Sequence, residues 1–406
     1  MTNVPEIRFK EFAEDWDQRK LGEIAEFSKG NGYSKGDLTS AGTPIILYGR
    51  LYTKYETVIE NVDTFVEMKE KSVISVGGEV IVPSSGETAE DISRASVVGK
   101  AGVILGGDLN IIKPDSIIDP AFLAITISNG NQQKELSKRA QGKSVVHISN
   151  SDLKDVSLHL PSIHEQTAIG KFFRTLDTAI TLKQHKLESL CKLKEAYLQV
   201  MFPQVGEAMP KVRFNGFAGE WIEISLGEIL TERKQRQKIT DTLPLLAFAA
   251  GQGVIDRSER RTNNRDFLTH DAASKVYLLT HKDDIVYNPS NLKYGAIDRN
   301  KHGSGVISPI YVTFETTEIP SFVELIVTSE AFKEKALQYE EGTVTKRQSV
   351  KPEMLLSLTV MISPAHDEQA AIGNFFCNLD TQITDLTTKV ETLIKLKSAY
   401  LQRMFV

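Results

Sequence analysis

Cysteine is nearly absent from this sequence. Among 406 residues there are only two, Cys191 and Cys377, and they stand at different positions of two similar segments. Two thiols supply neither a disulfide framework nor a metal cluster, so the sequence excludes a small secreted fold held by disulfides and a cysteine-bound structural metal. We expect both cysteines to be structural residues.

Long apolar runs are missing as well. No stretch of about 18 apolar residues could cross a membrane. The first residues, MTNVPEIRFKEFAEDW, lack the basic, apolar and small-residue succession of a signal peptide. With 41% hydrophobic and 25% charged residues the chain is typical of a globular protein, and its length suits two domains. We therefore expect a cytoplasmic protein.

The sequence also lacks a surplus of positive charge. The net charge is −5, divided as −5 over residues 1–163, +2 over 164–203, −1 over 204–363 and −1 over 364–406. Proteins that bind nucleic acid usually have a basic surplus. Contact with DNA, if it occurs, must therefore rely on local basic patches or on basic partners.

What the sequence does contain is an internal repeat. Residues 165–202 and 368–405 align without a gap and are identical at 24 of 38 positions. Residues 5–24 and 210–229 are identical at 10 of 20 positions, again without a gap. About 135 residues in each copy separate these matching segments and hardly resemble one another. The pattern indicates a duplicated frame with two unlike inner regions.

The inner regions are predicted to be rich in β-structure. Short β-branched runs bounded by Gly and Pro, such as TPIILYG in the first copy and KVYLLTHKDDIVYNP in the second, are typical of strands. One helix is expected over residues 120–139 and another over 320–340, each with Pro near its first turn. A Gly-led loop follows each helix, and a short strand then leads into the repeated segment.

The repeated segment has the spacing of a coiled coil, with apolar residues at alternating steps of four and three. The predicted seam comprises Ile169, Phe173, Leu176, Ile180, Leu187, Leu190, Tyr197, Met201, Ile372, Phe376, Leu379, Ile383, Leu386, Val390, Leu393, Tyr400 and Met404. Lys183, Lys194 and Lys397 interrupt it. Each helix would be a rod of about 55 Å. We expect the two helices to pack together antiparallel as a spacer; the alternative is that each packs on its own domain.

An ordered set of motifs occurs twice. The first copy has Trp16, Leu21-Gly22-Glu23-Ile24, Pro161, Glu165-Gln166, Ile169, Phe172-Phe173, Leu176-Asp177 and Ile180. The second has Trp221, Leu226-Gly227-Glu228-Ile229, Pro364, Glu368-Gln369, Ile372, Phe375-Phe376, Leu379-Asp380 and Ile383. This duplicated frame, which covers the whole chain, resembles the specificity subunit of type I restriction-modification systems.

The resemblance implies an α+β fold with two β-rich mixed target recognition domains in pseudo-two-fold arrangement, separated by an antiparallel coiled coil of two long helices. It implies recognition domains at residues 1–163 and 204–363 and conserved helices at 164–203 and 364–406. Each domain would recognise one half of a bipartite, interrupted site in double-stranded DNA. The helices would set the spacing, roughly one turn of DNA, and dock methyltransferase subunits, expected to be two. Restriction subunits would join the same complex.

The sequence predicts no catalytic site, cofactor or metal. Phe248–Gly253 has Ala and Gln where a methyltransferase Phe-x-Gly-x-Gly loop would need glycine at positions 250 and 252. Asn288-Pro-Ser-Asn291 lacks the aromatic residue that would stack on a flipped base. No P-loop pattern is present, and the eight histidines have no metal-ligand spacing. Catalysis is expected in the partner subunits.

DNA contact requires cations for phosphates and guanine, and amides for adenine. Loops of the first copy that combine cations, aromatic rings and glycine contain the candidates Lys29, Asn31, Tyr33, Lys35, Arg50, Tyr52, Lys54, Lys143 and Ser144. In the second copy, residues 233–265 have eight Arg or Lys and three acids. The candidates there and beyond are Arg233, Lys234, Arg236, Arg257, Arg260, Arg261, Asn263, Arg265, Asn291, Lys293, Tyr294, Lys346, Arg347 and Gln348.

Two other functions stay open at this point. The chain could be a scaffold that joins two protein-binding domains through a coiled coil, which the absence of a basic surplus would suit. A divergent DNA methyltransferase or nuclease is the second alternative, and the incomplete motifs argue against it.

Overall fold

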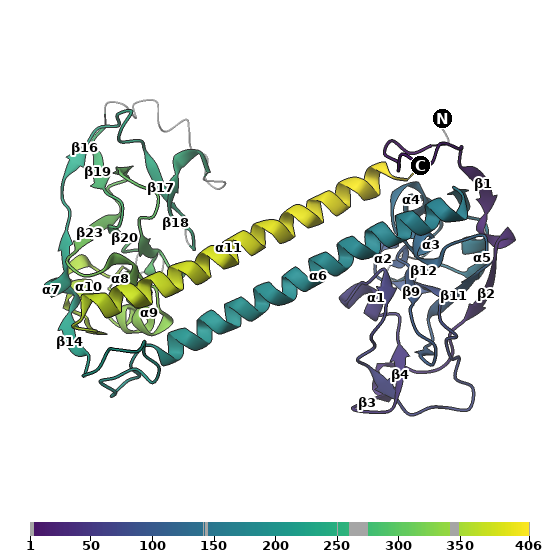
Figure 1. Cartoon of the computed structure of the whole chain (residues 1–406), viewed down its shortest axis with the longest axis horizontal. Helices are drawn as coiled ribbons and strands as arrows, with labels where there is room; N and C mark the ends of the chain where they lie inside the picture. The colour runs from purple at the N-terminus through teal and green to yellow at the C-terminus, as the bar shows by residue number, and fades with distance from the viewer. Residues whose placement is uncertain are drawn as a thin grey trace. The chain divides into compact units, whose positions relative to one another are not determined.

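The computed structural model describes residues 4–140, 142, 145–249, 251–259, 275–341 and 349–405. The chain divides into two units: unit 1 comprises residues 1–187 and 386–406, and unit 2 comprises residues 188–385. Each long helix therefore starts in one unit and ends in the other (Figure 1).

Unit 1 begins with thirteen short strands and five short α-helices in its described residues. The strands are β1 (Asp17–Lys20), β2 (Ala25–Lys29), β3 (Leu38–Thr39), β4 (Thr43–Ile46), β5 (Val58–Ile59), β6 (Phe65–Val66), β7 (Val80–Pro83), β8 (Ser85–Gly86), β9 (Ser96–Val98), β10 (Ile104–Leu105), β11 (Leu109–Pro114), β12 (Val146–His147) and β13 (Ser157–Leu160). The helices are α1 (Arg50–Thr53), α2 (Ala89–Ile92), α3 (Pro120–Ile127), α4 (Gly130–Arg139) and α5 (Asn150–Lys154). The long helix α6 (Ile163–Val200) follows.

Unit 2 has eleven strands in its described residues, and the short helices stand at different places among them. Its strands are β14 (Ile222–Ser225), β15 (Leu230–Glu232), β16 (Arg236–Gln237), β17 (Leu246–Ala249), β18 (Gly253–Asp256), β19 (Tyr277–Thr280), β20 (Ile285–Tyr287), β21 (Ile297–Arg299), β22 (Gly305–Ile307), β23 (Val312–Thr316) and β24 (Thr359–Ile362). Its helices are α7 (Leu226–Ile229), α8 (Pro320–Val327), α9 (Glu330–Leu337), α10 (Pro352–Ser357) and the long α11 (His366–Arg403).

The sheets show which part of the frame is shared. Unit 1 has a sheet of order β2-β11-β7-β9-β5, and unit 2 has the corresponding order β15-β23-β20-β21. We call these the proximal sheets, because their apolar side chains belong to the cores that contact the long helices. The remaining larger sheets, the distal sheets, differ: β10-β4-β6-β3 in unit 1 and β16-β19-β22 in unit 2. The proximal sheet is thus the common scaffold, and the distal sheet is what distinguishes the units.

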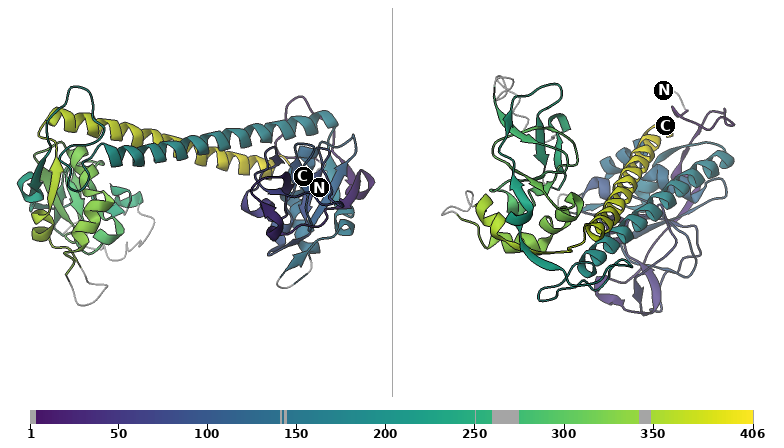
Figure 2. Two further views of the ribbon diagram at one scale, coloured as in Figure 1. Left: turned by 90° about the horizontal axis from the view of Figure 1, so that it is seen from below. Right: turned by 60° about the vertical axis from the view of Figure 1, so that its left-hand side comes forward.

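The two long helices pack against each other antiparallel within each unit, as expected. In unit 1, Phe172 of α6 contacts Tyr400 of α11 edge to face, with ring centroids 5.1 Å apart. In unit 2, Tyr197 and Phe375 make the corresponding contact at 5.0 Å. Views from two further directions show the helices side by side (Figure 2). The predicted seam residues are buried or half-buried throughout.

Two lysines that interrupt the apolar seam form ion pairs between the helices. Lys397 contacts Asp177 at 2.5 Å in unit 1, and Lys194 contacts Asp380 at 2.5 Å in unit 2. The two lysines stand at equivalent positions of the repeat, as do the two aspartates. Both pairs therefore have the same antiparallel register, and a charged pair replaces an apolar contact at the same place in each unit.

Each core is completed by the phenylalanine that follows the end of the long helix entering from the other copy. In unit 1 the Phe405 ring lies 5.8 Å from Phe122 and 6.0 Å from Phe173, and Phe122 also contacts Trp16. In unit 2 Phe202 makes the corresponding contacts with Phe322, Phe376 and Trp221. This exchange explains why the Met-Phe ending of the repeat is identical in both copies.

The first turn of each long helix is held by a buried carboxylate. Glu165 accepts hydrogen bonds from Arg8 Nε at 2.6 Å and Nη2 at 2.7 Å. Glu368 accepts the equivalent pair from Arg213 at 2.6 and 2.8 Å. Both carboxylates are almost fully buried. Arg8 and Arg213, from the matching segments 5–24 and 210–229, are therefore the partners of the Glu-Gln pairs that begin the long helices.

A glycine one turn further along lets each long helix approach its neighbour closely. A Cβ atom on Gly373 would lie 2.1 Å from the hydroxyl of Ser321, and one on Gly170 would lie 2.9 Å from a carboxylate oxygen of Asp119. The identical Ile-Gly pair in the repeat thus reflects packing against the start of α3 or α8.

One prediction about the helices was wrong in detail. The segments 120–139 and 320–340 each form two helices, α3 with α4 and α8 with α9. Asn129 and Ser329 have extended backbones between them. The preceding Ser128 and Thr328 hydroxyls bond to the carbonyls of Ala124 and Glu324, which ends the first helix.

Candidate nucleic-acid interface

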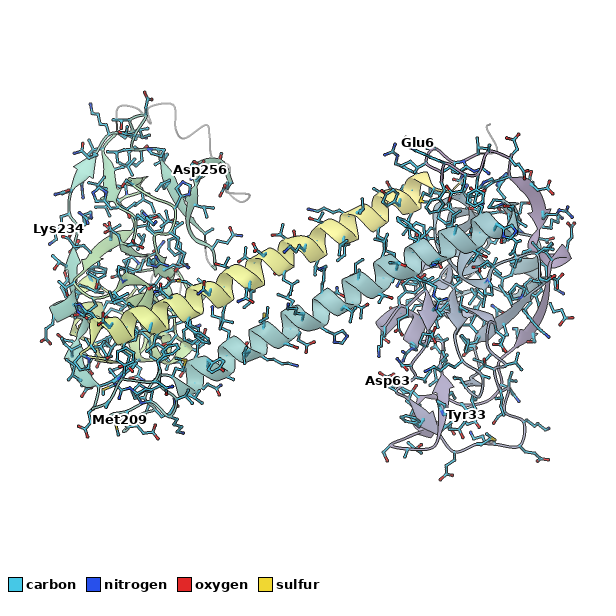
Figure 3. All side chains as sticks on the ribbon, in the orientation of Figure 1. Glu6, Tyr33, Asp63, Met209, Lys234 and Asp256 are labelled. Carbon is cyan, nitrogen blue, oxygen red and sulfur yellow. The ribbon has the colours of Figure 1, made fainter. Side chains whose placement is uncertain are left out.

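The first predicted DNA loop, at the end of β2, is held in an unusual backbone conformation. Gly32 and Tyr33 both have φ of 58°. The Tyr33 hydroxyl accepts the backbone N–H of Lys69 at 2.7 Å and lies 2.6 Å from the Ser72 hydroxyl. A left-handed tyrosine costs about 1–3 kcal/mol, and such strain occurs preferentially at functional sites. Figure 3 shows Tyr33 in the part of unit 1 that contains the distal sheet.

The other predicted side chains of this loop differ in accessibility. The Asn31 amide donates to the carbonyl of Lys71 at 2.9 Å, so it helps to fix the loop. Lys29 and Lys35 are exposed. Lys69 pairs with Asp37 at 2.6 Å, and this hydrogen bond, together with those from Ser34, lowers the pKa of the Asp37 carboxyl to about 2. Lys29 and Lys35 are therefore the side chains of this loop that are available to a ligand.

In the second predicted loop, Arg50 and Tyr52 are held by contacts within the chain. The Arg50 side chain is only 7% exposed, and its guanidinium donates to Asp63 at 2.6 Å and Glu56 at 2.7 Å. The Tyr52 hydroxyl donates to the carbonyl of Ser85 at 2.5 Å, and burial raises its pKa above the ordinary value. Arg50 and Tyr52 hold the loop together, because releasing either one would leave buried polar groups unpaired. Lys54 is exposed, although it pairs with Asp63.

Several candidates lie outside the described residues. They are Lys143, Ser144, Arg260, Arg261, Asn263, Arg265, Lys346, Arg347 and Gln348.

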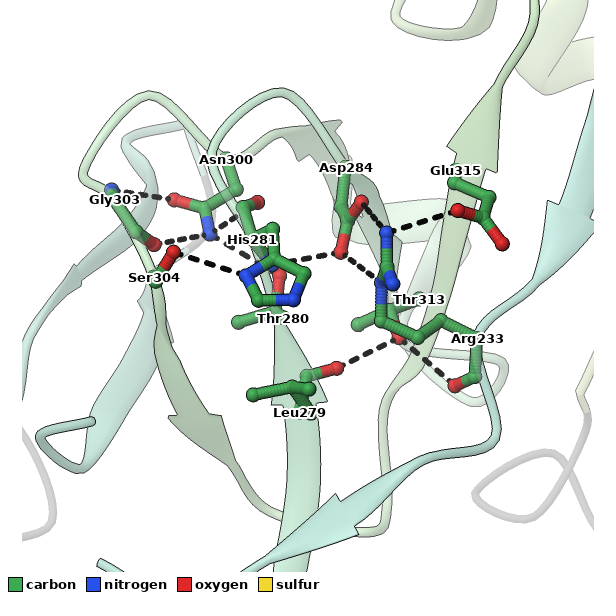
Figure 4. A network of polar contacts seen from close by, with 10 residues as sticks. All are labelled: Arg233, Leu279, Thr280, His281, Asp284, Asn300, Gly303, Ser304, Thr313 and Glu315. Carbon is green, nitrogen blue, oxygen red and sulfur yellow. Dashed lines mark hydrogen bonds and ion pairs between the residues drawn. The ribbon is translucent and has the colours of Figure 1, made fainter. Parts of the chain in front are cut away.

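In unit 2 the first predicted cation, Arg233, belongs to a polar network (Figure 4). The network joins the segment before β16 to β23 and to the turn between β19 and β20. Its Nε donates to Asp284 at 2.8 Å, and its Nη2 donates to Asp284 at 3.0 Å and to Glu315 at 3.1 Å. The hydrogen bond to Asp284 raises the pKa of Arg233 further above its ordinary value. With its side chain 14% exposed, Arg233 anchors the chain just before β16.

The same network fixes the turn between β19 and β20. Asp284 accepts the backbone N–H of His281 at 2.8 Å. The Asn300 amide donates to Thr280 Oγ1, the His281 carbonyl and the Gly303 carbonyl. The His281 ring lies 2.9 Å from the Ser304 hydroxyl (Figure 4). Hydrogen bonds and an ion pair therefore hold both the segment that precedes β16 and the turn that follows β19.

Next to this network lies a surface that we call the basic ribbon, formed by residues 234–238 and 275–277. Arg236 pairs with Leu278 and Gln237 with Tyr277 in an antiparallel ladder, extended by the Leu279 N–H bond to the Gln235 carbonyl. All five residues of 234–238 are exposed, among them Lys234, Arg236 and Lys238. Figure 3 shows Lys234 at the outer edge of unit 2. β16 is the edge strand of the three-stranded sheet β16-β19-β22, and its exposed cations are accessible to phosphates or base edges.

The remaining described candidates lie on two short turns. Arg257 is half-buried in a one-turn 3₁₀-helix after β18. Asn291 is exposed, and Tyr294 is 67% exposed at the end of the next 3₁₀-helix. The Lys293 ammonium lies 5.5 Å from the Tyr294 ring centroid and 3.9 Å from Glu340. Tyr294 thus presents an exposed ring suited to stacking or apolar contact.

Local sequence patterns predicted only part of the ribbon, and they assigned Arg233, one of its supports, to DNA contact. Gln237, Lys238 and Lys275 were not singled out, although the alternation Lys-Gln-Arg-Gln-Lys over 234–238 is a signal for an exposed edge strand. Asp284 was not among the predicted residues either. Its contact with Arg233 spans 51 residues, and no local pattern could have indicated it.

The incomplete enzyme motifs have structural roles. Phe248 is buried in β17, and the Asn288 carboxamide oxygen accepts the backbone N–H of Ser290. Within the described part of the chain, no three His, Cys, Asp or Glu side chains are placed to hold a metal ion. In the same residues no helix has the length and apolar character needed to cross a membrane.

Comparison with known proteins gives a consistent picture. Residues 13–192 match the family described as "Type I restriction modification DNA specificity domain". The putative type I restriction enzyme MjaX specificity subunit of Methanocaldococcus jannaschii is 24% identical over 243 residues, which is 55% of this chain and 55% of that protein. The MjaVIII specificity subunit of the same organism is 20% identical over 233 residues, or 56% of this chain and 52% of that protein. The chain therefore spans about half the length of these curated relatives in the match.

The fold has a counterpart among solved structures. The S subunit of the type I restriction-modification system from M. genitalium superposes with a TM-score of 0.65 at 16% sequence identity, covering 99% of both chains. The likeness shows that the fold extends over the whole chain.

Proposed function

We propose that this chain, which belongs over residues 13–192 to the type I restriction modification DNA specificity family, is the DNA sequence-specificity subunit of a type I restriction-modification complex. Each unit recognises one half of a bipartite, interrupted DNA site through its distal sheet and neighbouring loops. The long helices set the spacing of the two halves and dock methyltransferase subunits, two in number. Methylation and cleavage belong to partner subunits, restriction subunits among them, and the complex acts in the cytoplasm, where the DNA is.

The observation that carries this proposal is the contrast between shared scaffold and unlike surface. The Arg–Glu pairs, the ring contacts and the order of the proximal sheet recur in both units. The distal sheets differ in strand order and in side chains. A protein that must present two different recognition surfaces to the same partners requires this combination. A scaffold for two unrelated proteins would not need the helix seams to stay alike.

The function as a whole is tested by methylome sequencing of the host with and without this gene. We expect one bipartite motif, interrupted by a fixed number of unspecified bases, to lose its methylated bases when the gene is deleted and to regain them on complementation. Loss of a continuous motif, or no change in a strain that expresses the partner subunits, would contradict the proposal.

The basic ribbon gives a sharper prediction for unit 2. The double variant Arg236→Ala/Lys238→Ala, assembled with its methyltransferase subunits, is expected to bind target duplex about 10–100-fold more weakly at moderate salt. If both side chains contact phosphates, the slope of log affinity against log salt falls by about 1.8, because each phosphate contact contributes about 0.9. Titrations at several salt concentrations measure both quantities.

A matched control uses two exposed lysines outside the distal sheets. Lys113→Ala/Lys211→Ala removes the same charge from β11 and from the loop that follows α6, and it is expected to leave affinity and slope unchanged. If Arg236→Ala/Lys238→Ala behaves like this control, the cations of β16 only protect a sheet edge from pairing, and unit 2 recognises DNA elsewhere.

A further inference from the structure

The two distal sheets contain one pair of strands in common. In unit 1, residues 73–75 extend the distal sheet, because Ile74 pairs antiparallel with Ile104 of β10. In unit 2, β19 pairs antiparallel with β22. Four residues separate residues 73–75 from β7, and four residues separate β19 from β20. Since β7 and β20 both belong to the proximal sheets, residues 73–75 and β19 are counterparts.

The turns that follow these two segments are also built alike. Glu79 accepts the backbone N–H of Val76 at 2.6 Å and that of Gly77 at 3.0 Å. Asp284 accepts the backbone N–H of His281 at 2.8 Å. Both carboxylates are buried, and each stands three residues after the first N–H that it binds. Val76 is thus the counterpart of His281, and a buried carboxylate fixes its backbone.

The outer edge of this strand differs between the units. In unit 2, β16 of the basic ribbon pairs with β19, and Leu279 is only 6% exposed. Among the residues that the structure describes, no strand pairs with the outer edge of residues 73–75. Ile74, the counterpart of Leu279, is 45% exposed. Val76 is 70% exposed, more than any other large apolar side chain described in unit 1. We call Ile74 and Val76 the apolar edge.

The apolar edge adjoins the first predicted DNA loop. The Asn31 amide donates to the Lys71 carbonyl, and the Tyr33 hydroxyl accepts the Lys69 N–H, so this loop and the segment before the edge form one surface. The exposed charged side chains without an ion pair in the described part of this surface are Lys29, Lys35, Glu67, Glu70 and Lys71. Because three cations and two acids nearly cancel, attraction to phosphates contributes little to affinity here.

The apolar side chains themselves indicate what the surface binds. In the major groove the apolar group that base edges present is the C5 methyl of thymine. Ile74 lies on a paired strand and Val76 on a fixed turn, so neither backbone has to be ordered on binding. An exposed apolar strand edge also favours pairing with other chains unless a ligand covers it. DNA bound by the adjoining loop would cover this edge.

We propose that the apolar edge recognises thymine in the half-site bound by unit 1, through contact of Ile74 and Val76 with thymine methyl groups in the major groove. The inference rests on the function proposed above and adds to it the class of base that unit 1 recognises. In unit 2 the cations of the basic ribbon occupy the equivalent place. Two units that present different chemistry at one place of a shared frame recognise different half-sites.

Duplexes in which uracil replaces thymine test the proposal, because uracil lacks only the methyl group. The chain, assembled with its methyltransferase subunits, is titrated with its methylome-derived target and with duplexes that have uracil in one half or in the other. Uracil in one half is expected to weaken binding about fourfold for each methyl group contacted. Uracil in the other half should have the same effect on the unchanged chain and on variants of the apolar edge.

The variant Ile74→Thr/Val76→Thr keeps both side chains β-branched and replaces apolar groups by hydroxyls. It is expected to bind the thymine duplex about 4–15-fold more weakly, as for one or two lost methyl contacts, and to bind thymine and uracil duplexes equally in the half that unit 1 recognises. The slope of log affinity against log salt should not change, because no phosphate contact is removed.

The matched control is Ile117→Thr. Ile117 is 49% exposed between β11 and α3, outside the distal sheet. This variant should keep both the affinity and the preference for thymine over uracil. Thermal unfolding of both variants should match the unchanged chain, since the altered side chains are exposed.

The outcomes separate the two levels of the argument. If thymine and uracil duplexes bind equally well in both halves, or if Ile74→Thr/Val76→Thr keeps the difference, the apolar edge does not recognise thymine, although the proposed function stands. Loss of methyltransferase subunits from this variant in native mass spectrometry would identify the edge as a protein contact and overturn the proposal. If the complex binds its target no better than unrelated duplex, the proposed function itself fails.

Discussion

Arg213→Ala is expected to lower the free energy of unfolding of unit 2 by about 3–5 kcal/mol. Its guanidinium makes two hydrogen bonds to Glu368, at 2.6 and 2.8 Å, and the carboxylate is fully buried. Without the cation, the buried Glu368 carboxylate keeps only neutral hydrogen-bond donors, such as the Trp221 indole N–H at 3.2 Å. The penalty for that uncompensated charge is far larger than the value of the ion pair itself.

The two tryptophans allow this effect to be measured in one unit at a time. Trp16 lies in unit 1 and Trp221 in unit 2, and each is 2% exposed. In a Trp16→Phe background, urea unfolding followed by fluorescence reports on unit 2 alone. Arg8→Ala, the equivalent change in unit 1, serves as the control and should leave the Trp221 transition in place. A loss below about 1 kcal/mol for Arg213→Ala would show that Glu368 escapes to solvent.

The same contact predicts a dependence on pH. Burial raises the pKa of Glu368, but the hydrogen bonds from Arg213, Ser363 and Trp221 outweigh it, so the pKa lies below the ordinary 4.5. A lowered carboxyl pKa contributes stability that is fully present above 4.5 and is lost as the pH falls through the lowered value. Unit 2 should therefore lose stability below pH 4.5, and Arg213→Ala should remove this part of the pH dependence.

Phe405→Ala is expected to destabilise unit 1 by about 3–5 kcal/mol while unit 2 is unaffected. Phe405 stands two residues after the end of α11, and its ring contacts Phe122 and Phe173 of unit 1. The cavity left by alanine cannot collapse easily, because Phe122 and Phe173 are themselves fully buried among other core residues. A residue near the end of the sequence thus stabilises the unit that contains its beginning.

Unfolding followed at Trp16, in a Trp221→Phe background, measures this loss, since Trp16 lies 5.8 Å from Phe122. Ile394→Ala on the same helix is the control: Ile394 is 45% exposed, and its loss should cost little. Phe202→Ala should produce the reciprocal result, with unit 2 destabilised and unit 1 spared. An equal effect of Phe405→Ala on both units would mean that they unfold together.

The sequence alone was sufficient for the parts of the molecule that depend on repetition and periodicity. The matched segments indicated two copies of one frame, and the steps of four and three predicted two long helices with a buried seam. The resemblance to specificity subunits, which rested on the same residues, is confirmed by the family match over residues 13–192. These features can be predicted from the sequence because one physical requirement, a continuous apolar face, repeats along many residues.

The DNA candidates show the limit of local patterns. Arg50 and Arg233 look like ligand-binding cations beside aromatic or basic neighbours, but the fold pairs them with Asp63 and Asp284. Lys35, Lys234 and Arg236 have similar surroundings in the sequence and are exposed. Whether a cation is accessible depends on which carboxylates the strands bring near it, and that choice is made by pairs far apart in the sequence.

The sequence by itself determined the duplication, the helix pair and the shared scaffold, because short-range periodicity and internal identity encode them. Only the tertiary structure decided that Phe405 completes the first core and Phe202 the second, and that Lys194 and Lys397 pair with Asp380 and Asp177. It also decided which cations stay in solvent. The physical reason is that burial and ion pairing depend on which elements pack against one another. Residues that are distant in the sequence come together only when the chain folds.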